Sequence, residues 1–176
     1  MKKRTAKQNI RLKGGIKRLK SAPRNEIYLV LDNIRSMYNV GAIFRTADGV
    51  RAKKIYLCGI TAQPPREKIY KTSLGAVEWV DWEYVPKAKV KIQNLKREGI
   101  QIVCLEQTDN STHFKKAKYK APVAVVVGHE LRGISSDVLK LCDLSVELPM
   151  HGRANSLNVA TAAGIILYEV LDKISK

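Results

Sequence analysis

The sequence predicts a single α/β domain built on a largely parallel sheet of about six strands. Short runs rich in β-branched residues alternate with segments of helical periodicity from residue 26 onward. The run at 122–128 is apolar on both faces, as expected when helices cover both sides of a parallel sheet. A chain of 176 residues is also long enough to bury a sizeable core as one domain.

Six strand-like runs follow one another along the chain. They are IYLVL (27–31), KIYLCGI (54–60), AVEWV (76–80), IQIVCLE (100–106), PVAVVVG (122–128) and LSVELP (144–149). The predicted helices are at 40–49, 66–73, 87–98, 111–118, 134–142 and 156–173. Ligands of such sheets bind beyond the carboxyl ends of the strands, so the functional site is expected in the loops there.

Positive charge is concentrated at the N-terminus. The formal net charge is +16, and residues 1–24 contain ten Lys or Arg and no acidic residue. We expect residues 1–24 to form a basic, flexible arm and residues 25–176 to form the domain. Such an arm suits binding to RNA, because Lys and Arg side chains that neutralise phosphates release counterions, and this release favours the complex. A solvated tail with no specific partner, a mitochondrial targeting peptide and a membrane-surface helix are the alternatives.

Several classes of protein are disfavoured by what the sequence lacks. It has no apolar run of membrane-spanning length and no secretory signal, so we expect a cytoplasmic protein with no membrane partner. Cys58, Cys104 and Cys142 are widely spaced, which predicts reduced, buried thiols and no metal site. The sequence also lacks the glycine-rich motifs of dinucleotide enzymes and of NTPases.

The segment NVGAIFRTADG (39–49) places an arginine on an otherwise apolar helix. At 100° per residue, one face of this helix carries Val40, Ile43, Phe44 and Ala47. Arg45 lies on the other side, one turn from Gly41 and Ala42, where we expect an open floor for a ligand. An ion pair with Asp48 is the alternative for Arg45. Asn39 is also a candidate N-cap of the helix.

Two loops at the carboxyl ends of the last two strands are suited to a close ligand. VVVGHELRG contains Gly128, which permits an approach that any Cβ would block, and VELPMHGRANS contains Pro149 and Gly152. We expect main-chain groups of both loops to read an adenine edge, with ordinary turns as the alternative. Asn155 or Ser156 is expected to cap the last helix.

The last helix is apolar on all sides from Val159 to Leu167 and is rich in alanine and glycine. A helix that is apolar all round is enclosed by protein. Small side chains let a second helix approach closely, so we expect a homodimer interface here. Burial within one chain is the alternative.

Three blocks, NVGAIFRTADG, VGHELRGI and LPMHGRANSLNVATAAG, resemble in this order the SpoU (TrmH-like) branch of the SPOUT RNA methyltransferases. The family pattern is an asparagine with an arginine six residues on, then G-x-E, then a proline-and-glycine loop that leads into Ser-Leu-Asn. The resemblance covers residues 26–173. His129 falls on the variable position of G-x-E and is given no role.

The resemblance implies transfer of a methyl group from S-adenosylmethionine to a ribose 2′-hydroxyl of tRNA or rRNA. It also implies a C-terminal trefoil knot that binds the cofactor, and a homodimer with the active site near its interface. Carried over residue by residue, it assigns the cofactor to the backbone around Leu105, Gly128, Leu148, Met150 and Leu157. It assigns the polar active-site set to Arg45, Asn39, Glu130, Ser156 and Asn158.

Arg45 is the residue on which this chemistry is expected to depend. A guanidinium keeps its charge near neutral pH, so it suits stabilising negative charge on the 2′-oxygen, or holding the adjacent phosphate, better than accepting a proton. Two other classes of function stay open. They are a non-catalytic RNA-binding or ribosome-assembly protein on the same fold, and an α/β enzyme acting on a small acidic metabolite.

Overall fold

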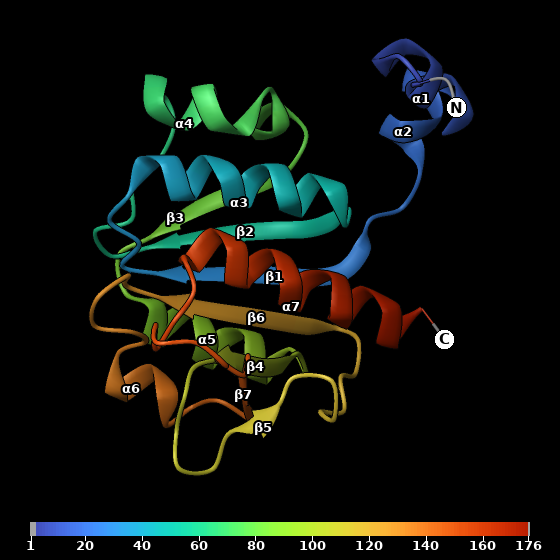
Figure 1. Cartoon of the computed structure of the whole chain (residues 1–176). Coiled ribbons are helices and arrows are strands. Elements are labelled where there is room, and N and C mark those ends of the chain that lie inside the picture. The colour runs from blue at the N-terminus through green and yellow to red at the C-terminus, as the bar shows by residue number, and fades with distance from the viewer. Residues whose placement is uncertain (1–2, 176) are drawn as a thin grey trace.

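The computed structural model describes residues 3–175 and contains one seven-stranded sheet, in the order β3-β2-β1-β6-β4-β7-β5 (Figure 1). Every neighbouring pair is parallel. The strands are β1 (Asn25–Asp32), β2 (Ala52–Cys58), β3 (Asp81–Val85), β4 (Gln101–Leu105), β5 (Thr112–His113), β6 (Val123–Gly128) and β7 (Leu144–Glu147). The predicted α/β fold with a parallel sheet is confirmed, with seven strands in place of six. The trefoil knot stays a prediction.

Helices cover both faces of this sheet. The helices are α1 (Ala6–Leu12), α2 (Gly15–Ser21), α3 (Met37–Gly49), α4 (Glu67–Ser73), α5 (Ala88–Arg97), α6 (Ser136–Leu139) and α7 (Val159–Ile174), with a 3₁₀ turn at Ala76–Glu78. The layer of α3, α4 and α7 lies on one face, and α5 and α6 lie on the other (Figure 1). Residues of β1 alternate between the two cores: Leu29 and Leu31 face α3 and α7, and Val30 faces α5.

Two predicted elements are wrong. The strand predicted at 76–80 is a 3₁₀ turn followed by β3 at 81–85. Its buried residues Ala76, Val77 and Val80 do not alternate, and Asp81–Val85 pairs with β2 instead. The helix predicted at 111–118 is replaced by β5 and a turn, because this segment pairs with the edge of β7.

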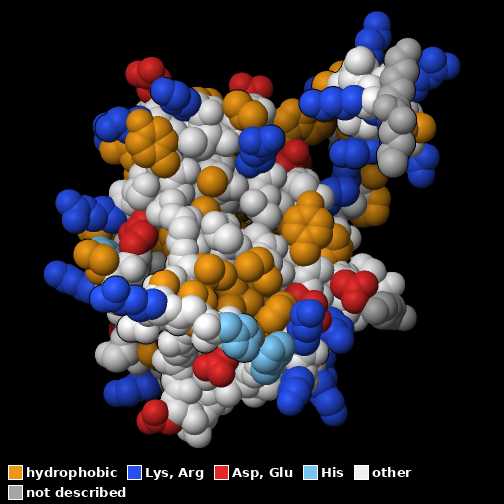
Figure 2. Space-filling model, viewed as in Figure 1, with side chains coloured by type: hydrophobic (Ala, Val, Ile, Leu, Met, Phe, Trp, Pro, Cys, Tyr) orange, Lys and Arg blue, Asp and Glu red, His pale blue; other side chains and the backbone are white. Residues whose placement is uncertain are grey.

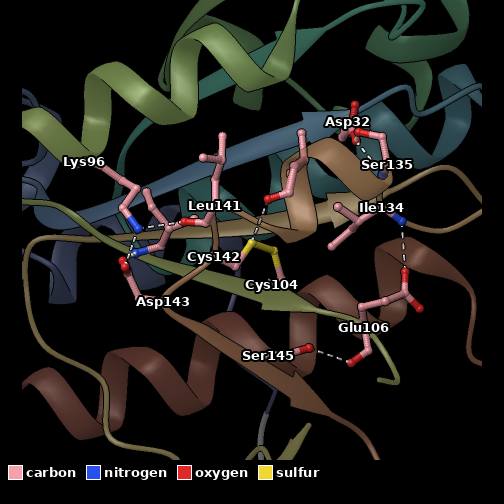
Figure 3. The surroundings of a disulfide bond; sticks show 12 residues. Asp32, Lys96, Cys104, Glu106, Ile134, Ser135, Leu141, Cys142, Asp143 and Ser145 are labelled. Atoms are coloured by element: carbon pink, nitrogen blue, oxygen red, sulfur yellow. Dashed lines mark hydrogen bonds and ion pairs between the residues drawn. A yellow bond between two sulfur atoms is a disulfide. The ribbon is translucent and has the colours of Figure 1, made fainter. Parts of the chain in front are cut away.

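The prediction of three reduced thiols is wrong for two of them. Cys104 of β4 and Cys142, which follows α6, form a disulfide (Figure 3). They are 38 residues apart in sequence, but α6 and the chain after it return to β4, and their Cα atoms lie 6.0 Å apart. Cys58 is free and buried, as predicted, and its burial raises the pKa of the thiol to about 12.

The basic arm contains two short helices, α1 and α2, that stand away from the sheet (Figure 1). Figure 2 shows Lys and Arg side chains spread over this arm. Its end is tied to the body by Arg51, whose guanidinium donates to the carbonyls of Ala22 at 2.7 Å and Leu19 at 3.3 Å. Residues 1–2 of the predicted arm and residue 176 of the predicted domain lie outside the described residues.

Within residues 3–175, none of the helices has the length and apolar character needed to cross a membrane.

Candidate active site

A pocket of about 350 Å³ opens beyond the carboxyl ends of β4, β6 and β7. Parallel strands place their following loops at one edge of the sheet, so segments distant in sequence meet there. All five residues predicted to surround the cofactor line this pocket: Leu105, Gly128, Leu148, Met150 and Leu157. Glu130, Ser156 and Asn158 of the predicted polar set line it as well.

The loop at 148–157 leaves its main chain available to a ligand. Among the described residues, none of its N–H or C=O groups bonds to another main-chain group. In residues 3–175, its single hydrogen bond is the one that Asn155 O accepts from Gln107 Nε2 at 2.9 Å. Backbone groups of a folded protein are normally paired with something, so this loop has unused capacity to bind a polar ligand.

The charge of the pocket is opposite to that of the chain. Among the residues that the structure describes, its lining contains three glutamates, Glu106, Glu130 and Glu147, and no lysine or arginine, although the protein carries a formal charge of +16. Such a lining favours a cationic ligand over an anionic one. Glu106 and Glu147 were not predicted from the sequence. Each lies at the carboxyl end of a predicted strand, where ligands of parallel sheets bind, and this position could have indicated them.

Glu106 is held by the segment that follows β6. Its carboxylate accepts a hydrogen bond from the main-chain N–H of Ile134 at 2.9 Å, and its carbonyl accepts one from Ser145 Oγ at 3.1 Å (Figure 3). Gly133, with a φ of +68°, lets the carboxylate lie close to the backbone, because a Cβ at Gly133 would contact the carboxylate of Glu106.

Glu130 ties the pocket to the start of α3. Its carboxylate accepts hydrogen bonds from the N–H groups of Arg35 at 3.0 Å and Ser36 at 2.9 Å, and from Asn39 Nδ2 at 2.9 Å. Burial alone would raise the pKa of this carboxyl, but the three donors outweigh burial and lower the pKa below its ordinary value. Glu130 is therefore ionised and fixed in orientation at neutral pH.

Asn39 and Asn158 extend this network to α7. Asn158 Nδ2 donates to Asn39 Oδ1 at 3.0 Å, and Asn158 Oδ1 accepts from the N–H of Ala160 at 2.9 Å. Asn158 is thus the N-cap of α7, so the prediction that Asn155 or Ser156 caps this helix is wrong. The N-cap of α3 is Ser36, and Asn39 lies three residues inside that helix.

The predicted open floor beside Arg45 is wrong at Gly41. A Cβ at Gly41 would contact Thr72 Oγ1 and the carbonyl of Ile69, so α4 occupies that space. At Gly128, likewise, the place of a Cβ is filled by the main chain of Gly133 and Ile134 rather than left to a ligand. Small residues here serve the packing of backbone against backbone.

Arg45 and Asn39 do not line the pocket. Asn39 is joined to it through Glu130 and Asn158. The guanidinium of Arg45 is exposed and, within residues 3–175, has no hydrogen-bond or ion-pair partner, so the predicted alternative of a pair with Asp48 is not formed.

The chain is similar to a family of known proteins. Residues 26–168 match the model of the SpoU rRNA Methylase family. The chain is 35% identical over 147 residues to the tRNA (guanosine(18)-2′-O)-methyltransferase of Aquifex aeolicus, covering 83% of this chain and 69% of that protein. It is 34% identical over 148 residues to YacO of Bacillus subtilis, assigned to the TrmH family of tRNA/rRNA methyltransferases, and covers 58% of its length.

Two solved structures are similar to the whole domain. The A. aeolicus TrmH/SpoU tRNA modifying enzyme superposes with a TM-score of 0.81 at 32% identity, over 94% of this chain and 83% of that one. The SpoU methyltransferase AviRb of Streptomyces viridochromogenes, in complex with AdoMet, superposes with a TM-score of 0.78 at 26% identity, over 88% and 60%.

Proposed function

The chain belongs to the SpoU rRNA methylase family, and from this premise we propose that it is an RNA methyltransferase. It uses S-adenosylmethionine and modifies a ribose 2′-hydroxyl of a structured tRNA or rRNA. The relatives named above are tRNA or tRNA/rRNA methyltransferases, and AviRb is a SpoU enzyme in complex with AdoMet.

The observation that carries the proposal is an acid-lined pocket in a basic protein. S-adenosylmethionine carries a sulfonium and an amino group, and Glu106, Glu130 and Glu147 complement those positive charges. The volume of about 350 Å³ suits a small ligand, and the unpaired main chain of 148–157 offers donors and acceptors for an adenine edge. Apolar contacts would come from the predicted residues Leu105, Leu148, Met150 and Leu157.

When bound, the cofactor supplies a methyl group that its sulfonium makes electrophilic. The task of the protein is to orient the ribose and to ease loss of the 2′-hydroxyl proton. We assign the second task to Arg45, whose permanent charge stabilises the negative 2′-oxygen or holds the adjacent phosphate. Glu130, Asn39 and Asn158 keep the starts of α3 and α7 in register around the site, and Ser156 lines the pocket beside them.

We place Arg45 at this site through a homodimer formed by α7. The inner face of α7 is buried in its own chain through Ala163, Ile166 and Leu167. Its outer face exposes Ile165 and Tyr168, by 38% and 56%, and hydrophobic side chains gather on this side of the molecule (Figure 2). Because Arg45 does not line the pocket of its own chain, the second subunit would bring its own Arg45 to it.

The proposal includes RNA bound by both arm and body, and a cytoplasmic location, where tRNA and rRNA are available to a basic protein. The alternative is a non-catalytic RNA-binding protein on the same fold, which would bind RNA without binding the cofactor.

Calorimetry with S-adenosylmethionine separates the two functions. We expect one site per chain, with the affinity reduced at least tenfold by Glu106→Gln and unchanged by Glu67→Gln, which lies on α4 away from the pocket. Incubation with labelled cofactor and total tRNA or ribosomal RNA, followed by mass spectrometry of the nucleosides, should yield a 2′-O-methylated nucleoside. Binding of RNA without binding of the cofactor would favour the non-catalytic protein.

The dimer is tested by complementation. Arg45→Ala and Glu130→Gln chains are expressed together, and each variant is expected to be inactive alone. Half of the dimers then contain one chain of each kind. In such a mixed dimer, one site combines an intact Glu130 from one chain with an intact Arg45 from the other. We therefore expect about a quarter of the wild-type rate, against a background rate if Arg45 acts within its own chain. Sedimentation should show that Tyr168→Glu dissociates the dimer.

A further inference from the structure

A second cavity, of about 440 Å³, adjoins the cofactor pocket. The two share the segment His129–Leu131 as a common wall. The rest of the second cavity is formed by the start of α3 and by Lys68 of α4. Its contents would therefore lie next to whatever fills the first pocket.

The side chains of the second cavity offer an aromatic face and two unpaired cations. Tyr38 is 46% exposed, and its phenol has no hydrogen-bond partner within residues 3–175. Lys68 Nζ lies 5.9 Å from the centroid of the Tyr38 ring. Neither Lys68 nor the guanidinium of Arg35 has an acidic partner in the part of the chain that the structure describes.

The main chain at Tyr38 is anchored to α4. Tyr38 lies in the first turn of α3, and its carbonyl accepts a hydrogen bond from Thr72 Oγ1 of α4 at 3.0 Å. The acid in the shared wall, Glu130, has both carboxylate oxygens occupied by the donors from Arg35, Ser36 and Asn39. Arg35 and Lys68 outnumber this carboxylate, so the side chains of the second cavity carry a net positive charge, opposite to that of the first.

We propose that the second cavity binds one unstacked nucleotide of the RNA, an inference that rests on the proposed function. The base stacks on Tyr38, and Lys68 and Arg35 neutralise flanking phosphates. Bases stack on aromatic side chains without regard to sequence, and phosphates seek unpaired Lys and Arg, so this pairing of groups fits a single strand.

The position of the cavity also suits the proposed reaction. Tyr38 and Arg45 are seven residues apart on α3, which puts them on the same helix face about 10 Å apart along its axis. A nucleotide held at Tyr38 would therefore lie beside the shared wall of the cofactor pocket of its own chain. Along α3, the strand would extend toward Arg45, which the proposed dimer assigns to the pocket of the second subunit.

Fluorescence anisotropy with a labelled 12-nucleotide oligouridylate tests the inference. Its bases are largely unstacked, and we expect Tyr38→Ala to raise the Kd about 5- to 150-fold, as loss of one stacked base does. Tyr38→Phe, which keeps the ring, should stay within twofold of the wild type. Lys68→Ala should lower the slope of log K against log salt by about 0.7, the value of one phosphate contact on a single strand.

Matched controls lie on the same helix as Lys68. Tyr70→Ala removes an exposed aromatic ring of α4, and Lys71→Ala removes an exposed cation that has no acidic partner within residues 3–175. Neither residue lines a cavity, and both variants should bind the oligouridylate as the wild type does. A 12-base-pair RNA duplex should bind equally well to the wild type and to Tyr38→Ala, because its bases are already stacked.

Each result has a distinct meaning. The site is overturned if wild type fails to bind the oligouridylate, if Tyr38→Ala binds it unchanged, or if Tyr38→Ala turns a dimer into a monomer in sedimentation, which would make the cavity a subunit contact. If Tyr38 controls binding but the wild type transfers no methyl group, the proposed function fails and the nucleotide site stands. If Tyr38→Ala binds and methylates like wild type, the function stands and the site falls.

Discussion

Arg45 combines exposure with the lack of any protein partner within residues 3–175. An unpaired cation adds little to folding, so its removal should affect the reaction and not the fold. We expect Arg45→Ala to lower kcat/KM by about 100- to 1000-fold, the usual effect of losing a charge-stabilising donor, and Arg45→Lys to keep part of the rate.

The affinity for S-adenosylmethionine should stay within twofold in Arg45→Ala. Arg97→Ala, an exposed arginine on the opposite face of the sheet, serves as the control and should be fully active. A near-normal rate for Arg45→Ala in a methyl-transfer assay would remove Arg45 from the mechanism.

Glu130 links stability to pH. Its three hydrogen-bond donors hold the pKa of the folded carboxyl below that of the unfolded chain, about 4.3 for a free glutamate. The stabilisation is therefore complete above pH 4.3 and is lost as the pH falls through the folded pKa. We expect Glu130→Gln to lower the free energy of unfolding by about 1–2 kcal/mol at pH 7, after allowance for partial exposure, and by less as the pH falls below 4.

Urea unfolding at several pH values measures this effect, with Glu78→Gln as the control, because Glu78 is exposed and is not hydrogen-bonded through its side chain in the described chain. If Glu130→Gln lowered the free energy of unfolding equally at pH 7 and pH 3.5, the negative charge of Glu130 would not be the source of the stabilisation.

Individual site residues were predictable to the extent that they carry a spacing. The resemblance to the SpoU pattern indicated Asn39–Arg45, Gly128–Glu130 and Ser156–Asn158, and the structure brings the second and third of these pairs to one pocket while Arg45 lies outside it. Hydrogen-bond partners were not predictable, because Asn39 and Asn158 are 119 residues apart and meet only in the folded chain. The disulfide between Cys104 and Cys142 was not predicted for the same reason, because the two residues are 38 positions apart in the sequence.

Among the helices and strands, the strongly periodic segments were predicted well, and the strands at the edges of the sheet were not. The apolar runs of β1, β2 and β6 and the helical pattern of α3 are dictated by burial on one or two faces. The two-residue strand β5 exists only because β7 offers it an edge to pair with. No local pattern in residues 111–118 could reveal that edge.

Helix α3 packs so closely against α4 that a single methyl group at Gly41 should disturb it. A Cβ at Gly41 would contact the main-chain carbonyl of Ile69, which cannot move as a flexible side chain does. We expect Gly41→Ala to destabilise the protein by about 1–3 kcal/mol, despite the higher helix propensity of alanine. Thermal or urea unfolding measures the change.

Gly152→Ala is the matched control, because a Cβ at Gly152 has no neighbour within 4 Å and its φ is not positive. Its stability should stay within about 0.5 kcal/mol of the wild type. If Gly41→Ala were instead more stable than the wild type, the close approach of α3 and α4 would be disproved.

Over the whole molecule, acidic and basic side chains are concentrated in different places. The cofactor pocket has an acidic lining, the adjoining cavity presents Arg35 and Lys68, and the arm carries nine Lys or Arg within residues 1–21. In the proposed function, a net charge of +16 would attract RNA over long range, and the acidic lining would repel the RNA backbone from the cofactor pocket.

Removal of residues 1–21 tests the arm, and it leaves Arg24, which bonds to Ala52 O, in place. Each phosphate that the protein neutralises adds about 0.7 to 0.9 to the salt slope of RNA affinity, so removing an arm that neutralises at least three phosphates should flatten the slope by about two units or more. Substituting glutamine for Lys7, Arg11 and Lys17 in the 176-residue chain should reproduce most of this change, because it removes charge and keeps α1 and α2. The affinity for S-adenosylmethionine should be the same in all three proteins, since the arm does not line the pocket. An unchanged slope after truncation would mean that the body alone holds the RNA, and the basic character of residues 1–21 would need another cause.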